Sequence, residues 1–294
     1  MLFDIRLSIS YDYASPAAGG RHLVRVMPAD RPGQQRLVAG HLDIRPTPAE
    51  RHDRLDFFGN LTTEFAFRAP HDRIELKLQA RVQRSPAPTT GPASALGDLA
   101  AQVAAVHDLS PAAPHHFLAP SPRVPPDAGI AAFAARATLG SATVLEAVEA
   151  LGRAIHRDMT YDPDATEVDT PAAEAFAARH GVCQDFSHIM ISGLRSLGVP
   201  AGYVSGFLRT IPPPGKPRLE GADAMHAWVR AWCGPEMGWV DYDPTNALRP
   251  GTDHVTVAEG RDYFDVAPVK GVLRVSGRQT SKQAVDVLPL DLPA

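Results

Sequence analysis

The segment from Gly181 to His188 reads Gly-Val-Cys-Gln-Asp-Phe-Ser-His, and it constrains the fold of this chain more than any other stretch. A glycine break is followed by a cysteine and then by an apolar helical pattern. Residues that recur at the three-and-four spacing of one buried helical face are Phe186, Ile189, Met190, Gly193, Leu194 and Leu197. Cys183 therefore lies in the first turn of a predicted helix, on its inward face. The unpaired N–H groups and positive dipole end found there favour a thiolate, so Cys183 is a candidate nucleophile.

A cysteine alone is more often a small buried residue than a nucleophile, so its companions decide the interpretation. His226 begins one predicted strand and Asp243 ends another. Taken singly, His226 fits an ordinary half-buried histidine and Asp243, before Pro244, fits a turn former. Together, thiol, imidazole and carboxylate are the groups that covalent acyl transfer requires. The three residues thus form a predicted Cys-His-Asp active site.

Strand register favours Asp243 over Asp241 as the carboxylate. If residues 234–237 form a four-residue hairpin loop, Cys233 pairs with Gly238, and Thr245 falls opposite His226. Asp243 is then one diagonal step from His226 on the same face, about 7–8 Å between Cα atoms, whereas Asp241 is two steps away. A slip of one residue would reverse the faces, so the prediction depends on the loop length.

The chain divides into three predicted parts. Residues 1–85 carry alternating strand patterns at 2–10, 37–44, 62–67 and 74–82, typical of a small all-β domain, either a sandwich or a barrel. Residues 86–128 are a proline-rich linker, with one amphipathic stretch at 95–106. Residues 129–294 are an α+β core. Its predicted helices cover 130–137, 141–159, a segment opened by Thr170-Pro171 and closed by Gly181, and the cysteine helix; its strands cover 202–208, 226–233, 239–243, 272–275 and 284–288, with a loop at 212–217.

Charge and composition exclude several classes of function. The 294 residues carry 29 Lys and Arg against 33 Asp and Glu, a net charge of −4, so no basic surplus is available for nucleic acid. We find no export signal and no apolar run of the roughly 20 residues that span a bilayer. Two cysteines, Cys183 and Cys233, exclude a disulfide framework and fit a reducing compartment, so we expect a cytoplasmic protein without a membrane partner. Cys233, beside Trp232, is interpreted as a core residue.

No metal or organic cofactor is expected. On a helix that turns about 100° per residue, Asp185 and His188 point away from Cys183, so these three residues do not make a metal site. His115 and His116 lie in the linker without paired ligands, and no calcium loop of EF-hand type is present.

Four blocks of the core, and the N-terminal part, resemble bacterial transglutaminase-like proteins. The blocks are residues 181–188, 194–206, 223–229 and 238–246, and the N-terminal features are Phe58-Gly59-Asn60 and Pro70-His71-Asp72. The resemblance implies a papain-like α+β core with Cys183 as nucleophile, His226 as base and acid, and Asp243 as the residue that orients the histidine. Ser187 and Met225 stand where small residues such as alanine and serine are expected, which affects packing more than chemistry.

Three functions remain open at this point. The first is acyl transfer from a carboxamide, such as a glutamine side chain, through a thioester to an amine or water. The second is a cysteine peptidase or amidase, and the third is a non-catalytic binding or scaffold module. We expect a protein or peptide substrate, or a small amide, with the backbone N–H of Cys183 as an oxyanion donor and Tyr203 and Trp228 as candidate walls of the cleft.

Overall fold

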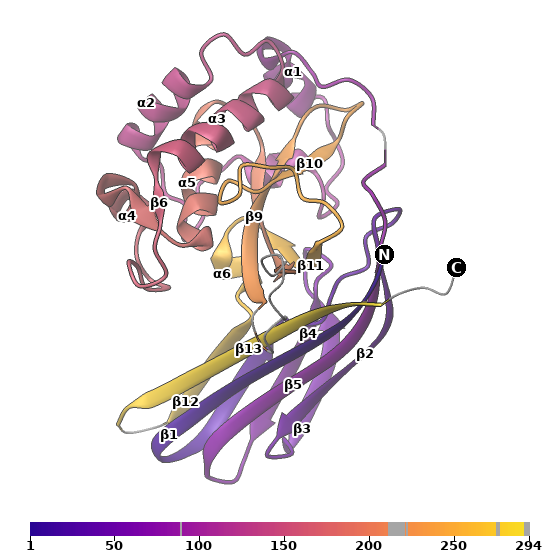
Figure 1. The fold of residues 1–294 in the computed structure, drawn as a ribbon, viewed down its shortest axis with the longest axis vertical. Coiled ribbons are helices and arrows are strands. Elements are labelled where there is room, and N and C mark those ends of the chain that lie inside the picture. The colour runs from indigo at the N-terminus through magenta and orange to yellow at the C-terminus, as the bar shows by residue number, and fades with distance from the viewer. Residues whose placement is uncertain (89, 211–220, 222, 275–276, 291–294) are drawn as a thin grey trace, which may run out of the picture.

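The computed structural model describes residues 1–88, 90–210, 221, 223–274 and 277–290. A β-rich part built mainly from the N-terminal third lies at one end, and a part with helices packed on a smaller sheet lies at the other (Figure 1). This arrangement confirms the predicted α+β core preceded by an all-β region. The predicted loop at 212–217, and residue 275 at the end of a predicted strand, lie outside the described residues.

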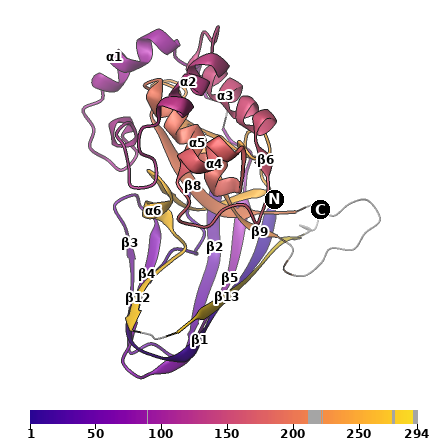
Figure 2. The same cartoon turned by 90° about the vertical axis from the view of Figure 1, so that its left-hand side faces the viewer.

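The β-rich part is a seven-stranded antiparallel sheet organised around its first strand. Its strands are β1 (Leu2–Val24), β2 (Gln35–Arg45), β3 (Glu50–Leu55), β4 (Leu61–Phe67), β5 (His71–Arg84), β12 (Val269–Arg274) and β13 (Gln279–Leu290). The first half of β1 pairs with β5 and β13, and its second half pairs with β4 and β12. In Figure 2 the β3–β4–β12 half and the β2–β5–β13 half lie on opposite sides, so β1 passes from one layer to the other.

The two C-terminal strands lie elsewhere than the sequence analysis placed them. Residues 272–275 and 284–288 were assigned to the core, but β12 and β13 pair with β1. The register of β13 runs from Leu2 opposite Leu290 to Tyr13 opposite Gln279, which buries Val285 and Val287. An alternating pattern predicts a strand but does not name its partner, because any strand with one apolar face satisfies it.

The linker contains short helices and is fastened to the core. Its elements are η1 (Leu96–Asp98), α1 (Leu99–Ala104) and η2 (Pro114–Phe117). The N–H of Ser94 donates to the carbonyl of Cys233 at 2.9 Å, and the carbonyl of Ser94 accepts from Val144 at 2.9 Å. Gly234 has a positive φ of 107°, and a Cβ there would collide with the Ser94 side chain. This glycine therefore allows the linker to approach the hairpin closely.

The core packs helices on one face of a four-stranded antiparallel sheet, whose strand order is β10-β9-β8-β11 (Figure 1). The strands are β8 (Ala201–Leu208), β9 (Ala224–Trp232), β10 (Trp239–Tyr242) and β11 (His254–Gly260). The helices are α2 (Ala128–Ala137), α3 (Val144–Asp158), α4 (Ala172–Ala178), α5 (Cys183–Ser196) and α6 (Tyr263–Val266); β6 (Thr160–Tyr161) and β7 (His180–Gly181) form a small parallel pair.

Local signals place most helix boundaries. Thr143 and Glu146 form a capping box at the start of α3. The end of α4 differs from expectation, because Arg179 in the left-handed conformation (φ 62°) ends the helix, and Gly181 belongs to β7. Non-glycine residues take this conformation less readily, so sequence reasoning assigned the stop to the nearby glycine.

Helix α5 begins at Cys183, as predicted, and forms the centre of the core. Every residue from Gln184 to Leu194 is buried, because α2, α3 and α4 cover one side and strands β8 and β9 cover the other. Such a helix cannot slide or rotate without disturbing several neighbours. Its first residue, Cys183, is consequently held in a fixed place. No helix among the described residues has both the length and the apolar character that a membrane crossing requires.

Candidate active site

Cys183 is positioned by the turn that precedes α5. The Asp185 carboxylate accepts the backbone N–H of Val182 at 2.8 Å and the hydroxyl of Thr166 at 2.6 Å, so it anchors the first turn of the helix. Gly181 lies against this carboxylate, and a Cβ at residue 181 would come within 2.6 Å of Asp185 Oδ2. The glycine before the cysteine is thus explained by close packing. Cys183 itself is half-buried, unlike the fully buried Cys233.

The structure brings Cys183, His226 and Asp243 together. Nε2 of His226 donates to Oδ2 of Asp243 at 2.8 Å, and the Cys183 side chain lies close enough to the imidazole to raise its pKa. Because Asp243 occupies Nε2, the ring nitrogen available to the sulfur is Nδ1. Thiol, imidazole and carboxylate are therefore neighbours in that order, the arrangement in which a histidine can exchange a proton with a nucleophile while a carboxylate holds the ring.

The hairpin between β9 and β10 sets this geometry. Trp239 pairs with Trp232 and Tyr242 pairs with Val229, and the N–H of Cys233 donates to the carbonyl of Gly238 at 2.8 Å. This is the register assumed from a four-residue loop. Asp241 points elsewhere: it forms an ion pair with Arg31 at 2.8 Å and accepts the Trp228 indole N–H at 3.3 Å.

Asp243 is held by donors on both carboxylate oxygens. Oδ1 accepts the backbone N–H groups of Thr245 at 2.9 Å and Asn246 at 3.2 Å. Oδ2 accepts the Asn246 side-chain amide at 2.7 Å, in addition to His226 and a second histidine, His254, at 3.1 Å. The carboxylate is completely buried, so these contacts replace its hydration and leave it little freedom to rotate.

The protonation of the site follows from these contacts. Burial alone would lower the pKa of His226, but hydrogen bonds to Asp243 and Cys183 outweigh it and raise the pKa to about 10. Burial would raise the pKa of Asp243, yet hydrogen bonds from His226 and His254 hold it far below its ordinary value. At neutral pH the site thus contains an imidazolium between a carboxylate and the sulfur.

His254 is the residue that sequence reasoning missed. It is the first residue of β11, is buried, and packs edge-on against Trp228 with 5.2 Å between ring centroids. Its Nδ1 has no hydrogen-bond partner among the described residues, so the bond to Asp243 is its polar contact. A lone histidine at a strand start carries no local motif, and β11 lies across the sheet from β10. The sequence signal available is the stretch His-Val-Thr-Val-Ala-Glu-Gly at residues 254–260, which is typical of a strand but does not show what its first residue contacts.

His226, Asp243 and His254 also form the one described cluster whose ligand atoms are close enough to hold a metal ion, all within 4.8 Å. Both Nε2 atoms already donate to the same oxygen of Asp243, so hydrogen bonds account for the cluster. Cys183, Asp185 and His188 were judged from the sequence not to form a metal site. In the structure, Nε2 of His188 accepts the backbone N–H of Tyr263 at 3.2 Å.

Other residues singled out from the sequence have structural surroundings. Burial raises the pKa of Cys233 to about 12, which fits a core residue rather than a nucleophile. Trp228 was expected to line the cleft, but it is fully buried. It packs against His226 and His254 and so supports the site without lining an open cleft. Tyr203 is also buried, near Cys183 and against His188, with 5.1 Å between ring centroids.

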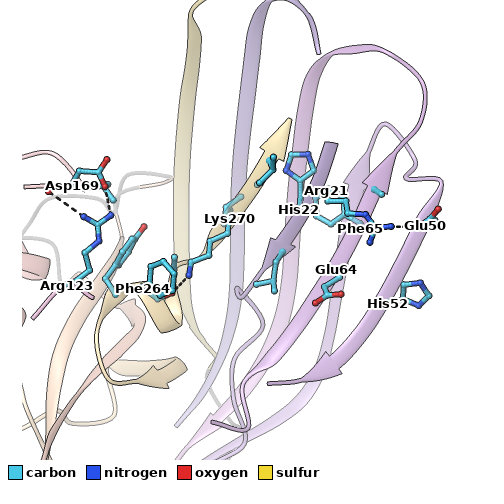
Figure 3. A pocket seen from close by; sticks show the side chains of 18 residues that line it. Arg21, His22, Glu50, His52, Glu64, Phe65, Arg123, Asp169, Phe264 and Lys270 are labelled. Carbon is cyan, nitrogen blue, oxygen red and sulfur yellow. Dashed lines mark hydrogen bonds and ion pairs between the residues drawn. The ribbon is translucent and has the colours of Figure 1, made fainter. Parts of the chain in front are cut away.

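A large cavity lies between the β-rich part and the core. Its volume is about 890 Å³, and Figure 3 shows Arg123, Asp169 and Phe264 along one side and Arg21, Phe65 and Glu64 along the other. Two of its lining residues are tied to α5. The carbonyl of Val168 accepts the side-chain amide of Gln184 at 2.9 Å, and Tyr263 donates to His188. The cavity wall is therefore attached to the helix that carries Cys183.

Comparisons with known sequence families match both parts of the chain. Residues 3–83 match the bacterial transglutaminase-like N-terminal region, and residues 131–244 match the transglutaminase-like superfamily. Cys183, His226 and Asp243 lie inside the second match, whereas His254 lies outside it.

Individual relatives extend the likeness over nearly the whole chain. An uncharacterised protein of Mycobacterium tuberculosis is 35% identical over 266 residues, covering 88% of this chain and 83% of its own. One from Mycobacterium leprae is 31% identical over 287 residues, covering 96% and 97%. A protein-glutamine gamma-glutamyltransferase of Pseudomonas aeruginosa is 36% identical over 92 residues, which cover 31% of this chain and 14% of that protein.

A solved structure shares the whole fold. A Cytophaga hutchinsonii protein, provisionally described as a cysteine protease, superposes with a TM-score of 0.77 at 23% identity. The match covers 100% of this chain and 92% of the other, so the β-rich part and the core occur together in both.

Proposed function

This chain belongs to the transglutaminase-like superfamily, and from that premise we propose that it is a cysteine-dependent acyltransferase acting on carboxamides. The observation that carries the proposal is the placement of Cys183 beside His226, whose imidazole is hydrogen-bonded to Asp243. The proposed acyl donor is a glutamine-type amide of a protein or peptide. The local likeness to a protein-glutamine gamma-glutamyltransferase supports this donor class.

In the first half-reaction, the Cys183 sulfur attacks the carbonyl carbon of the amide, and a C–S bond forms. The backbone N–H of Cys183, at the first position of α5, is the proposed donor to the oxygen that becomes negative. As the C–N bond breaks, His226 gives its proton to the leaving nitrogen, and ammonia departs. Asp243 holds the imidazole in place during this proton transfer and during the one in the second half-reaction. A thioester on Cys183 remains.

In the second half-reaction, an amine or a water molecule attacks the thioester. His226, now neutral, accepts a proton from the attacking group and returns to the imidazolium as the sulfur leaves. An amine acceptor gives a new amide, which is a cross-link when both substrates are proteins. Water gives a carboxylate and would make the protein an amidase or a peptidase on the same core.

The cavity between the two parts of the molecule is the proposed place for the part of the substrate chain beyond the reacting amide, since Cys183, His226 and Asp243 are not among the residues that line it. Its lining includes the exposed side chains of Val168 and Phe264, which offer an apolar surface to a peptide. Val168 and Tyr263 connect this surface to α5 through their hydrogen bonds with Gln184 and His188. Substrate bound on this surface would therefore influence the position of Cys183.

Mass spectrometry of a trapped acyl-enzyme tests the proposal. Wild-type protein is mixed with a panel of glutamine-containing peptides and simple amides, with and without a labelled primary amine. We expect an adduct on Cys183 and its loss in Cys183→Ala, whereas Cys233→Ala, which removes the buried thiol, should keep the adduct. The Cys233→Ala variant is the matched control for losing a cysteine.

The acceptor distinguishes the remaining functions. Incorporation of the labelled amine supports acyl transfer to amines. Hydrolysis without any incorporation contradicts that reading and leaves an amidase or peptidase. No adduct across the panel, together with equal alkylation of Cys183 in wild type and His226→Ala, would favour a non-catalytic binding module.

A further inference from the structure

A second cavity lies where the β-rich part, the linker and β10 meet. Its volume is about 520 Å³, and its walls come from all three regions of the chain. Three arginines, Arg31, Arg84 and Arg249, line it together with a single carboxylate, that of Asp241. The triad residues are not part of this lining. The cavity is therefore a cationic site separate from the candidate active site.

The buried charges around this cavity do not balance. Arg31 forms ion pairs with Asp241 at 2.8 Å and with Glu259 at 3.1 Å. Arg230, which is buried, pairs with the same Glu259. Two carboxylates thus serve Arg31 and Arg230, and neither forms an ion pair with Arg84. Buried ionised groups in proteins are normally paired, so the buried guanidinium of Arg84 requires an explanation.

Arg84 has polar contacts but forms no ion pair with a described carboxylate, although the charge of Asp241 is near enough to favour the cation weakly. It is 5% exposed, and its terminal nitrogens donate to the carbonyls of Gln34 at 3.2 Å and Gly251 at 3.0 Å. Its Nε is buried without a partner, and no carboxylate of the described residues forms an ion pair with it. Burial, followed by the nearby charge of Arg31, lowers the pKa of Arg84 to about 10. The groups around Arg84 therefore disfavour its charged form.

Arg249 adds a second positive charge that has no partner among the described carboxylates. Its side chain is exposed at the rim of the cavity. Arg84 lies at the end of β5 in the β-rich part, and Arg249 follows β10 in the core, so the two cations approach the cavity from different parts of the molecule. Planar guanidinium groups bind the oxygens of phosphate and carboxylate groups through two parallel hydrogen bonds.

We propose that this cavity binds a small multivalent oxyanion of the phosphate class, held between Arg84 and Arg249. The anion supplies the negative charge that the cluster of Arg31, Arg84, Arg230 and Arg249 lacks against Asp241 and Glu259. The space is larger than a bare phosphate requires, and Pro88, Met237 and Trp239 give it an apolar wall. An organic phosphate could therefore bind with its apolar portion on this wall.

The position of the site predicts what binding would do. The anion joins β5 to the segment after β10, so it links the β-rich part to the core. A ligand that binds only the folded arrangement stabilises it in proportion to its concentration relative to Kd. We therefore expect saturable stabilisation of the whole chain by phosphate.

The test uses the full chain and inorganic phosphate and pyrophosphate as probes, against chloride at equal ionic strength. Isothermal titration calorimetry measures binding, and thermal unfolding measures the shift in Tm. We expect saturable binding, a higher Tm, and at least tenfold weaker binding in Arg84→Gln and Arg249→Gln. Arg136→Gln, which removes an exposed arginine from α2, is the control with the same charge change and should bind as wild type does.

The outcomes separate a built site from general ionic effects. Equal stabilisation by phosphate and chloride, or the same loss of binding in Arg136→Gln, overturns the proposal. If Arg84→Gln does not fold, Arg249→Gln still decides the matter, because that side chain is exposed. Retention of full phosphate affinity in Arg249→Gln would also contradict the site.

Discussion

Asp243 is the residue on which the candidate site converges, since two histidines and the Asn246 amide all bond to its Oδ2. Of the two histidines, His226 is the one whose pKa Cys183 influences. His254 bonds to the carboxylate from β11, and its side chain has no other hydrogen bond among the described residues. We interpret His254 as a positioning residue, which fixes Asp243 so that Asp243 can fix His226.

Replacement of His254 tests this interpretation. In His254→Ala, Asp243 loses one donor, and we expect kcat to fall roughly 10- to 100-fold, because a hydrogen bond to a charged group contributes about 1.5–3 kcal/mol. His254→Gln keeps an N–H donor and should recover most of the loss. Steady-state kinetics with a glutamine peptide checks both variants. An unchanged kcat in His254→Ala, or a loss of equal size in His107→Ala at an exposed histidine, would contradict the role.

The raised pKa of His226 predicts a dependence of stability on pH. An unfolded histidine has a pKa of about 6.5, whereas the pKa of His226 is about 10 in the folded protein. The folded state therefore binds the proton more tightly, and this contribution to stability is full below pH 6.5 and is lost as pH rises through about 10. We expect the free energy of unfolding in urea to fall between pH 7 and 10, and to fall less in His226→Gln. If the free energy of unfolding falls equally with pH in the wild type and in His226→Gln, the raised pKa of His226 is contradicted.

The predicted proximity of Asp243 to His226 is found in the structure, because the spacing on which it depends is local. A four-residue loop was enough to choose Asp243 over Asp241, because a hairpin register extends from its turn. His254 could not be found in this way. Its distance from Asp243 depends on the order β10-β9-β8-β11, in which its own strand enters from the far edge.

Among the elements, α5 depends on the turn before it, and Gly181 tests that dependence. In Gly181→Ala the new Cβ would overlap Asp185, which must move and release the Val182 N–H. We expect a loss of about 1–3 kcal/mol in stability, the usual cost of overpacking, and reduced activity because Cys183 is only two residues further along the chain.

Urea unfolding and single-turnover acylation check this prediction. Gly97→Ala is the matched control, since a Cβ at residue 97 meets no atom within 4 Å. Wild-type stability in Gly181→Ala would show that the turn can adjust, and that the close packing is not required.

Element prediction failed where the periodic signal was absent. Strand β3 was missed because five of its six residues are exposed, which leaves no alternation to detect. Strand β1 was predicted only to residue 10, yet it continues to Val24, through Ala14, Ser15 and Pro16. Its second half is defined by pairing with β4 and β12 rather than by its own composition.

For the whole molecule, the β-rich part depends on the C-terminal strand β13. Val287 is fully buried and lies opposite Ile5. Val287→Ala removes two methyl groups from this contact, and we expect a loss of about 2 kcal/mol. Hydrogen exchange should increase first in residues 2–13 of β1, and less in α5. Val272→Ala in the neighbouring strand β12, at an exposed valine, should leave exchange unchanged.

The pairing of β13 with β1 also sets an order of events during synthesis. The first half of β1 leaves the ribosome before the other described elements, and β5 can join it later. Its other edge stays unpaired until residues 279–290 have emerged, after the entire core has been made. An open strand edge is a site of unwanted pairing, so the nascent chain passes through a long interval in which neighbouring copies could associate through β1.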